Sequence, residues 1–326
     1  MREGVVKTKV VGVGLTVEDT VYAIVDMRGN MLAQGKFITT DYPDVNDYAT
    51  HLAECILSLA EENGGYETIR SVGISVPSGN FMSGCIEYPP NLPWKGQTPL
   101  AAMLRDRMGL AVALGNDAHV RALSEYVYGS AHGLKDFIYI NLGHGVGSCI
   151  FYHDKVYLGA DGFAGEVGHT CVEPNGRQCS CGNRGCLETY CAAKGIMQTA
   201  RELLETESCP SLMREREIRN PKDIFLCCEE GDELAIRVFR ETGIRLGVGL
   251  ANYASIVNPD AIVVAGGIAH AGHWLLDSFR QSFEEHVFHN LKGRVKLLTS
   301  ILNEDERDIL GASALAWEVK EYSLFI

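Results

Sequence analysis

The sequence is short of proline, of basic residues and of long apolar runs, and each shortage excludes a class of protein. It has 10 Pro against 35 Gly. The glycines cluster in short turns between apolar runs, which is typical of α/β proteins that bind ligands on loops. Asp and Glu outnumber Lys and Arg by 42 to 29, and no local basic patch offsets the net charge of −13. We therefore expect no nucleic-acid partner.

Two further absences bear on the cellular compartment. No run of about 18 apolar residues exists, so we expect no membrane partner. The start, MREGVVKTKVVGVG, lacks an apolar signal segment followed by a small-residue cleavage site. The 11 cysteines are an odd number, and Cys55, Cys85, Cys149 and Cys228 lie in apolar contexts typical of buried free thiols. These features predict a reduced, cytoplasmic protein.

The order of predicted elements indicates an α/β protein with an internal repeat. Residues 8–39 read as three short strands joined by turns, followed by a helix over 44–63. The plan of strand, glycine turn, strand, tight turn and strand returns in residues 136–159. This predicts a duplicated core, although any α/β protein with several glycine turns would show part of the pattern. A last helix is expected to start near Gly311.

Residues 168–190, GHTCVEPNGRQCSCGNRGCLETY, carry a metal-ligand pattern. A C-x-C-x4-C motif with one histidine upstream supplies three thiolates and an imidazole, which together match a tetrahedral Cys3His zinc set. Neighbouring glycines let the backbone wrap around an ion. No open ligand position remains, so the zinc would be structural. The alternatives are free thiols or an oxidised pair, and a reducing compartment disfavours the pair. The predicted ligands are His169, Cys179, Cys181 and Cys186, with Cys171 as a spare.

Three carboxylates are candidates for chemistry. Asp117 stands where a strand ends and a helix begins, which is where ligands bind in open α/β sheets. Taken by itself, it is better explained as a helix N-cap. Glu166 and Glu188 flank the cysteine loop, so a zinc ion would hold them in fixed relation. Carboxylates accept hydrogen bonds from vicinal sugar hydroxyls, and the alternative for each glutamate alone is a solvated surface charge.

Three glycine-rich turns are candidates for phosphate binding. They lie at residues 12–16, 142–148 and 265–272. Such turns leave backbone N–H groups free for phosphate oxygens. None has the lysine of a Walker motif or the full dinucleotide fingerprint, so each by itself is a weak signal.

Taken together, these residues resemble the ROK family of repressors, uncharacterised reading frames and sugar kinases. The segments that carry the resemblance are GEVGH, CSCGNRGCLE, PPNLPW, GNDA and AGGI, and it runs nearly end to end. Glucokinase-like members are the most similar type. The resemblance implies a two-domain actin-like/hexokinase (ribonuclease H-like) fold with a duplicated core. It also implies a small α/β domain of residues 1–115 plus a C-terminal helix, 311–326, and a large domain of 116–310 that holds the zinc loop.

The resemblance also assigns roles position by position. It implies ATP and Mg²⁺ as cofactors, a hexose substrate and a homodimer. Asp117 matches the catalytic base. The matching sugar contacts are Asn91, Asn116, Glu166, His169 and Glu188. The matching nucleotide-binding positions are Gly14, Thr16, Gly143, Gly145, Gly266 and Gly267.

The phosphate turns depart from the family pattern. Where the family has Asp-x-Gly-Gly-Thr, residues 12–16 read Gly-Val-Gly-Leu-Thr, so Gly12 replaces an acid and Leu15 a glycine. In the family the acid helps to position magnesium and the glycine lets the backbone approach phosphate. We therefore expect Gly12 to face the ligand without an oxygen partner for the metal, and the Leu15 side chain to stand in the path of the phosphates. Where the family has Gly-Thr-Gly, His144 replaces the threonine, and His119 stands for the usual asparagine after Asp-Ala.

These departures leave two functions in competition. One is an ATP-dependent kinase of a hexose 6-hydroxyl, weakened by its phosphate turns; the other is a non-catalytic sugar-binding regulator. A DNA-binding repressor is disfavoured by the acidic charge and by a first strand that starts within about ten residues. The sugar is not identified, with glucose first and N-acetylated hexosamines or allose behind it.

Overall fold

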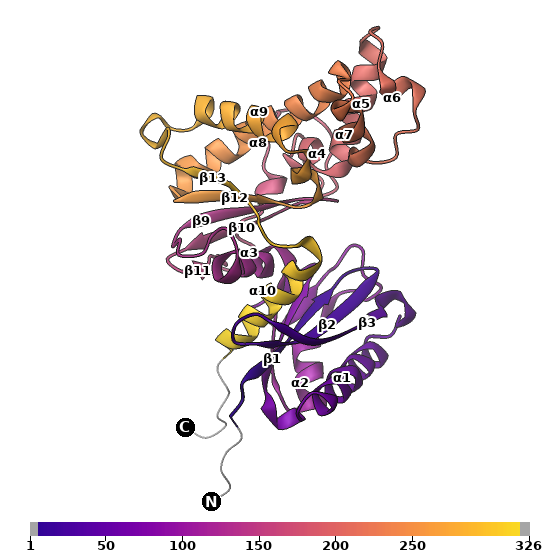
Figure 1. Cartoon of the computed structure of the whole chain (residues 1–326), viewed down its shortest axis with the longest axis vertical. Helices are drawn as coiled ribbons and strands as arrows, with labels where there is room; N and C mark the ends of the chain where they lie inside the picture. Colours follow the sequence, from indigo (N-terminus) through magenta and orange to yellow (C-terminus); the bar gives the residue numbers. More distant parts are fainter. Residues whose placement is uncertain (1–5, 320–326) are drawn as a thin grey trace, which may run out of the picture. The chain divides into compact units, whose positions relative to one another are not determined.

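The computed structural model describes residues 6–319, and these form two compact units. Unit 1 runs from the first described residue to Gly133 and adds Leu158–Phe163 and the segment from Ile301 onward. Unit 2 comprises Leu134–Tyr157 and Ala164–Ser300. Each unit has its own five-stranded sheet with helices on its faces (Figure 1).

The sheet of unit 1 has the strand order β3-β2-β1-β4-β8. Strands β1, β2 and β3 are antiparallel, whereas β4 runs parallel to β1 and β8 runs parallel to β4. The strands are β1 (Lys9–Leu15), β2 (Asp19–Asp26), β3 (Met31–Ile38), β4 (Ile69–Val76) and β8 (Ala111–Asn116).

Successive side chains of β1 point to opposite faces of this sheet, and different helices cover the two faces. Val11, Val13 and Leu15 enter the core that includes α1 (Val45–Glu62) and α2 (Leu100–Met108). The intervening positions face α10 (Glu304–Glu318), which lies on the other side of the sheet in Figure 1. Helix α10 approaches the strands closely because two facing residues are glycine. A Cβ at Gly12 would lie 2.5 Å from the Ile309 carbonyl oxygen, and one at Gly73 would lie 1.9 Å from that of Ala312.

The C-terminal helix begins earlier than the sequence predicts. Its N-cap is Asn303, whose side chain accepts from the Asp305 N–H. Gly311 does not start the helix but lies inside it. Residue 311 is glycine because a Cβ there would lie only 2.1 Å from the Val120 carbonyl oxygen of α3 (Asp117–Tyr128). The close packing of α3 on α10 places α3 in unit 1. The unit therefore extends to Gly133, beyond the boundary at 115–116 expected from the sequence.

A small sheet in unit 1 frames the loop that carries Asn91. It consists of β5 (Gly79–Asn80), β6 (Cys85–Glu87) and β7 (Gln97–Thr98). The loop between β6 and β7 is anchored by the buried Trp94, whose indole N–H donates to the Tyr42 carbonyl at 3.2 Å. Asn91 itself is exposed.

The sheet of unit 2 repeats the plan of unit 1. Its order is β11-β10-β9-β12-β13, with β11, β10 and β9 antiparallel and the next two strands parallel. This matches unit 1 strand for strand and confirms the predicted duplication. The strands are β9 (Phe137–Leu142), β10 (Val146–Tyr152), β11 (Lys155–Val156), β12 (Ala261–Ala265) and β13 (Lys296–Thr299).

Helices α8 (Glu233–Val257) and α9 (His273–His286) cover one face of this sheet (Figure 1). They pack closely because α8 has glycine at the contact, where a Cβ at Gly247 would lie 2.5 Å from Cβ of Ser282. The remaining helices of unit 2 are α4 (Glu188–Cys191), α5 (Ala193–Thr206), α6 (Leu212–Glu215) and α7 (Pro221–Glu229).

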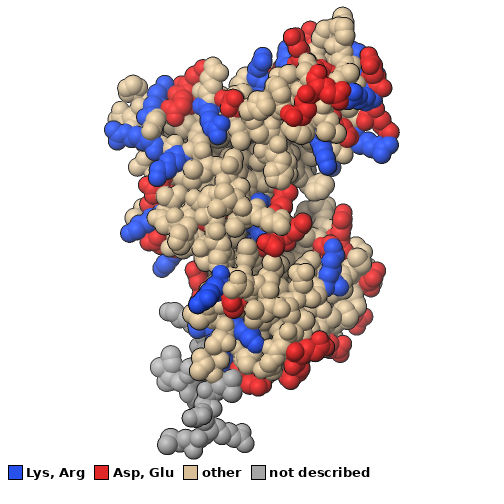
Figure 2. All heavy atoms as spheres, viewed as in Figure 1, with Lys and Arg blue, Asp and Glu red and all other residues tan. Residues whose placement is uncertain are grey.

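The surface and the thiols agree with the composition. On the face in Figure 2, Lys and Arg side chains lie among Asp and Glu side chains. None of the eleven cysteines, which all lie in the described part of the chain, forms a disulfide; Cys149 and Cys228 are buried as expected, whereas Cys55 and Cys85 are only partly buried. Among the helices of the described chain, none has the length and apolar character needed to cross a membrane.

Candidate functional site

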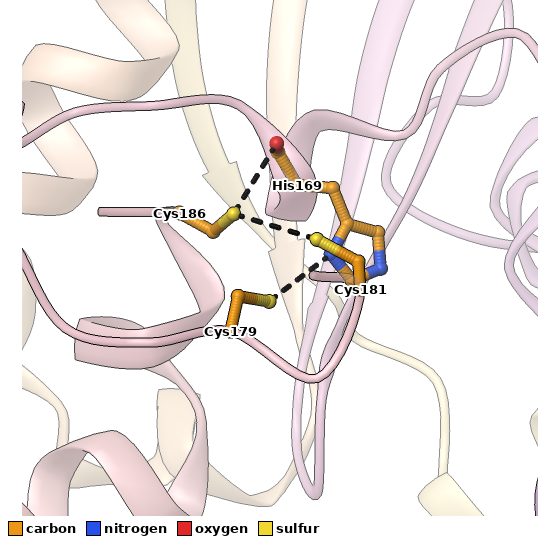
Figure 3. A group of neighbouring side chains, drawn as sticks. All are labelled: His169, Cys179, Cys181 and Cys186. Carbon is orange, nitrogen blue, oxygen red and sulfur yellow. Dashed lines mark hydrogen bonds between the residues drawn. The ribbon is translucent and has the colours of Figure 1, made fainter. Parts of the chain in front are cut away.

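The four predicted zinc ligands come together in unit 2 (Figure 3). Their ligand atoms all lie within 4.8 Å of one another. The Sγ atoms of Cys181 and Cys186 are 3.7 Å apart, and Sγ of Cys179 is 3.6 Å from Nδ1 of His169. A tetrahedral ion with ordinary Zn–S and Zn–N bonds sets about 3.8 Å between two sulfurs and about 3.6 Å between sulfur and nitrogen. The residues therefore fit a zinc ion.

The pKa values of two thiols in this cluster are shifted in opposite directions. A hydrogen bond from the backbone of Asn183 lowers the pKa of Cys181 to about 7. Burial raises the pKa of Cys186 to about 12, and the neighbouring thiols Cys179 and Cys181 raise it further. Three thiolates this close repel one another without a cation between them, so a bound cation is what would let all three ionise.

The cysteine loop is tied to the helices that follow it by one residue that sequence reasoning missed. Arg177 donates from Nη1 to the carbonyls of Thr189 and Gly195, both at 2.9 Å. Its guanidinium also lies over the Tyr190 ring, 4.6 Å from the centroid. Its position beside the C-x-C motif is the only sequence signal. Arg177 thus fixes the loop against α4, where Glu188 is the first residue.

Glu188 contacts the second glycine turn. Its Oε2 accepts from the Val146 N–H at 3.0 Å, directly after the turn of residues 143–145. A Cβ at Gly145 would lie 2.7 Å from this oxygen, so only glycine leaves room for the carboxylate. His144, at the tip, is exposed. Among the described residues, the N–H groups of His144 and Gly145 have no protein acceptor, so both can reach a ligand.

The third glycine turn lies against the second. Gly266 follows β12 with φ +93°, and a Cβ there would be 2.3 Å from the Leu142 carbonyl oxygen. Gly267 then begins the short helix η4 (Gly267–Ala271). The structure thus brings Gly143, Gly145, Gly266 and Gly267 to one end of the unit 2 sheet, together with Glu188.

Glu166 is held by a second residue that sequence reasoning missed, Ser148 on β10. The buried Ser148 hydroxyl donates to the Gly165 carbonyl and accepts from the Val167 N–H at 3.0 Å, so it fixes the backbone on both sides of Glu166. The carboxylate is on an exposed residue. A Cβ at Gly168 would lie 2.4 Å from the Val146 carbonyl oxygen, which explains the second glycine of GEVGH.

The first glycine turn in unit 1 is closed by its own threonine. The Thr16 hydroxyl accepts from the N–H groups of Glu18 and Asp19 at 3.2 and 3.0 Å, and the Thr16 N–H donates to the Asp19 carbonyl. Gly14 lies one residue inside the end of β1. Within the described residues, only the Val17 N–H of this turn lacks a protein acceptor.

Two expectations about this turn are wrong. Gly12 does not face a ligand, because a Cβ there would meet the backbone of α10. Leu15 does not stand in the path of phosphates either; it is 2% exposed and packs in the core of unit 1. An aspartate at position 12 would displace a helix, and a glycine at position 15 would leave a cavity. Both faces of β1 are buried, so the sequence pattern does not show to which face each side chain of the strand points.

Asp117 is the first residue of α3, and Asn116 is its N-cap. The Asn116 side chain accepts from the Ala118 N–H at 2.9 Å, and Asp117 Oδ1 accepts from the same N–H. The other carboxylate oxygen, Oδ2, lies 3.7 Å from Nη1 of Arg121. The side chain of Asp117 is 32% exposed, so solvent and ligands can reach it.

Arg121 belongs to an ion pair that nothing in the sequence indicates. Its Nε and Nη2 donate to the two carboxylate oxygens of Asp308 on α10, both at 2.8 Å. Ser75 on β4 donates to Asp308 Oδ1 at 2.9 Å. Residues 121 and 308 are 187 positions apart in sequence, so only the fold brings this pair beside Asp117.

The duplicated α/β core, with glycine turns at the ends of its sheets, is that of the two-domain actin-like/hexokinase fold. The Cys3His loop is an addition to this core. Comparison with known proteins agrees with this fold. The chain matches the ROK family over residues 10–319, and it belongs to that family.

Its relatives include both enzymes and regulators. A glucokinase from Thermotoga maritima is 31% identical, with the match covering 96% of this chain and 98% of that protein. A xylose repressor from Caldicellulosiruptor bescii is also 31% identical, over 76% of this chain and 62% of the repressor. A ROK family glucokinase from Streptomyces griseus, solved with glucose and AMPPNP, is 28% identical with a TM-score of 0.77, covering 95% of this chain and 100% of that one.

Proposed function

We propose that this protein is an ATP-dependent hexose kinase that phosphorylates a sugar 6-hydroxyl, with glucose as the first candidate. The observation that carries the proposal is the match to a glucokinase along nearly the whole length of both chains. The geometry supports it, because the matched residues of unit 2 lie together and those around Asp117 are accessible. The family resemblance also implies a homodimer, and the cysteine content favours a reducing, cytoplasmic compartment.

The sugar would be bound mainly through carboxylate, amide and imidazole groups. Glu166 and Glu188 accept hydrogen bonds from sugar hydroxyls. The Nδ1 atom of His169 faces the thiols, which leaves Nε2 for the sugar. Asn91 and Asn116 complete the proposed contacts. His169 and the three cysteines would hold a zinc ion, which would make the loop that carries these groups rigid.

The reaction follows from the position of Asp117. Its carboxylate takes the proton of the sugar 6-hydroxyl as the oxygen attacks the γ-phosphorus in line, and ADP leaves. Backbone N–H groups of His144 and Gly145 would receive phosphate oxygens, since they have no protein acceptor among the described residues. Mg²⁺ that enters with ATP would supply further charge neutralisation.

Release of ADP with a panel of sugars tests this function. Purified protein with MgATP and glucose, N-acetylglucosamine, N-acetylmannosamine, mannose or allose should release ADP with at least one sugar. Product analysis should find the phosphate on the 6-oxygen. Sugar binding by calorimetry without any ADP release would refute the kinase and support the second candidate.

A sugar-binding regulator without kinase activity is the second candidate. Two observations favour it: the Thr16 hydroxyl takes up two of the N–H groups that the first turn would offer to phosphate, and xylose repressors are among the relatives. Glu18 adds a negative charge to the same turn. Such a protein would bind sugar normally and MgATP weakly.

A further inference from the structure

Two carboxylates share one guanidinium in unit 1, and they share it unequally. Asp308 takes both Nε and Nη2 of Arg121 at 2.8 Å, in the parallel two-bond geometry that is the strongest form of this pair. Asp117 receives only Nη1, at 3.7 Å, which is beyond hydrogen-bond distance. The same arginine therefore stands within reach of the proposed general base but is held by another acid.

The sheet is shaped to hold this pair. Gly14, Ser75 and Gly115 lie side by side on β1, β4 and β8, since Gly14 pairs with Ser75 and Ser75 with Gly115. A Cβ at Gly14 would lie 3.1 Å from Cβ of Asp308, so the glycine makes room for the acid. Ser75 fixes one oxygen of Asp308 by donating to it at 2.9 Å. The small residues of this row thus fix the place of the Asp308 carboxylate.

We propose that Asp308 is a positioning residue that holds Arg121 away from Asp117 and so keeps Asp117 free to accept the proton of the substrate hydroxyl. The inference rests on the proposed kinase function. Asp117 and Arg121 stand four residues apart on α3, the spacing at which opposite charges meet on a helix surface. If Asp308 loses its charge, Asp117 is a second carboxylate that the guanidinium can approach, since its Oδ2 already lies 3.7 Å from Nη1. A carboxylate that accepts two Arg N–H groups is a weaker base, because the cation favours its charged form, and it has fewer lone pairs left for the hydroxyl.

The first test is a double-mutant cycle on turnover. Asp308→Asn should lower kcat by about 10-fold or more, because a general base contributes ~10²–10⁴-fold, while the sugar KM changes little. Arg121→Gln in the same chain removes the competing cation, so the double variant of Asp308→Asn with Arg121→Gln should recover most of the lost kcat. Arg121→Gln alone gives the reference for the double variant. Asp308→Glu, which keeps the charge, should stay close to the wild type.

The matched control removes another arginine–carboxylate pair that is held by two N–H groups. Arg216 binds Glu230 through two N–H groups at 2.6 and 2.7 Å on the surface of unit 2. Glu230→Gln should leave kcat unchanged. A purely structural role for Asp308 predicts that the double variant is as slow as Asp308→Asn or slower, and that result would overturn the inference. So would an Asp308→Asn variant with normal kcat.

A crystal structure of Asp308→Asn tests the position of Arg121 without any measurement of turnover. The shortest distance from an Arg121 Nη atom to an Asp117 oxygen should fall from 3.7 Å to the roughly 2.7–2.9 Å of a charged hydrogen bond. A guanidinium that keeps its place beside Ser75 and the new amide at position 308 would disprove the competition. If the wild type releases no ADP with any sugar, the kinase proposal fails, and the position of Arg121 in this structure still decides the inference.

Discussion

The two glycine turns that end the duplicated strand pairs occupy the same place in their sheets but are closed by different means. In unit 1, residues 16–18 join β1 to β2, and the Thr16 hydroxyl binds two N–H groups of its own turn. In unit 2, residues 143–145 join β9 to β10, and Glu188 from α4 binds the N–H that follows the turn. One turn is completed locally and the other by a distant carboxylate.

The two units share their strand order and the length of the turn, but not the groups that surround the turn. The strand order and the three-residue connections are kept in both units, because they satisfy the backbone hydrogen bonds of the sheet. The groups around each turn are not kept. A local threonine leaves one free N–H at the first turn, whereas Glu188 leaves the N–H groups of His144 and Gly145 free at the second. We therefore expect ligand contacts to depend more on the second turn.

Loss of the zinc should have the largest effect, and it should fall on unit 2. Metal analysis of protein purified without added zinc should find about one equivalent per chain. Cys186→Ser should abolish it and lower the unfolding temperature, because structural zinc contributes about 10–16 kcal/mol in small zinc domains. Sugar affinity should fall with it, since the loop carries Glu188.

Cys209→Ser is the matched control, an exposed thiol of unit 2 outside the cluster. It should keep the metal and the wild-type unfolding temperature. A metal-free protein that is folded and binds sugar would refute the zinc site.

Removing the proposed base should have the next largest effect, on turnover alone. Asp117→Asn keeps the size of the side chain but cannot take a proton, so kcat should fall by about 10²–10⁴-fold while the sugar affinity measured by calorimetry is kept. Asp106→Asn, an exposed acid on α2, should change neither. An Asp117→Asn enzyme with most of its turnover would show that Asp117 serves only the start of α3.

A single methyl group at the second turn should have a smaller effect and sharpen the comparison directly. Gly145→Ala places a Cβ 2.7 Å from Glu188 Oε2 and pushes the carboxylate off the Val146 N–H. The sugar KM should rise roughly 10-fold, in line with the 1–3 kcal/mol for a lost partner of a polar group. Gly143→Ala, two residues earlier, has its nearest contact at 3.5 Å and should leave the sugar KM close to the wild-type value. Equal effects of the two alanines would argue against a role for Glu188.

The smallest effect is expected at the first turn. Glu18→Gln removes one exposed negative charge beside the proposed phosphate position, so the KM for MgATP should fall by about 2–3-fold at low salt and less at high salt. Glu54→Gln, an exposed acid on α1, changes the net charge equally and should leave this KM unchanged. A response as large as that of the second turn would contradict the unequal roles of the two turns.

Local sequence was enough to predict the parts of this protein whose residues are close along the chain. The spacing of Cys179, Cys181 and Cys186 predicts a cluster because a short glycine-rich loop can bring three thiols together whatever surrounds it. Alternating apolar residues on both sides of each turn predict the strand pairs, and the recurrence of the pattern predicts the duplication that the two sheets confirm. These features depend on backbone geometry over a few residues.

Only the tertiary structure decided what each residue faces when its neighbours are far away in sequence. From the sequence, Gly12 is interpreted as the loss of a metal partner and Gly311 as the start of a helix. Both are glycine because α10 packs closely, on β1 at Gly12 and on α3 at Gly311. Leu15 reads as an obstacle to phosphates and lies in the core instead. The pair of Arg121 and Asp308 spans 187 residues and is invisible in either segment alone. The physical reason is that the close approach of α10 to β1, β4 and α3 places these groups in contact, and no local pattern encodes that approach.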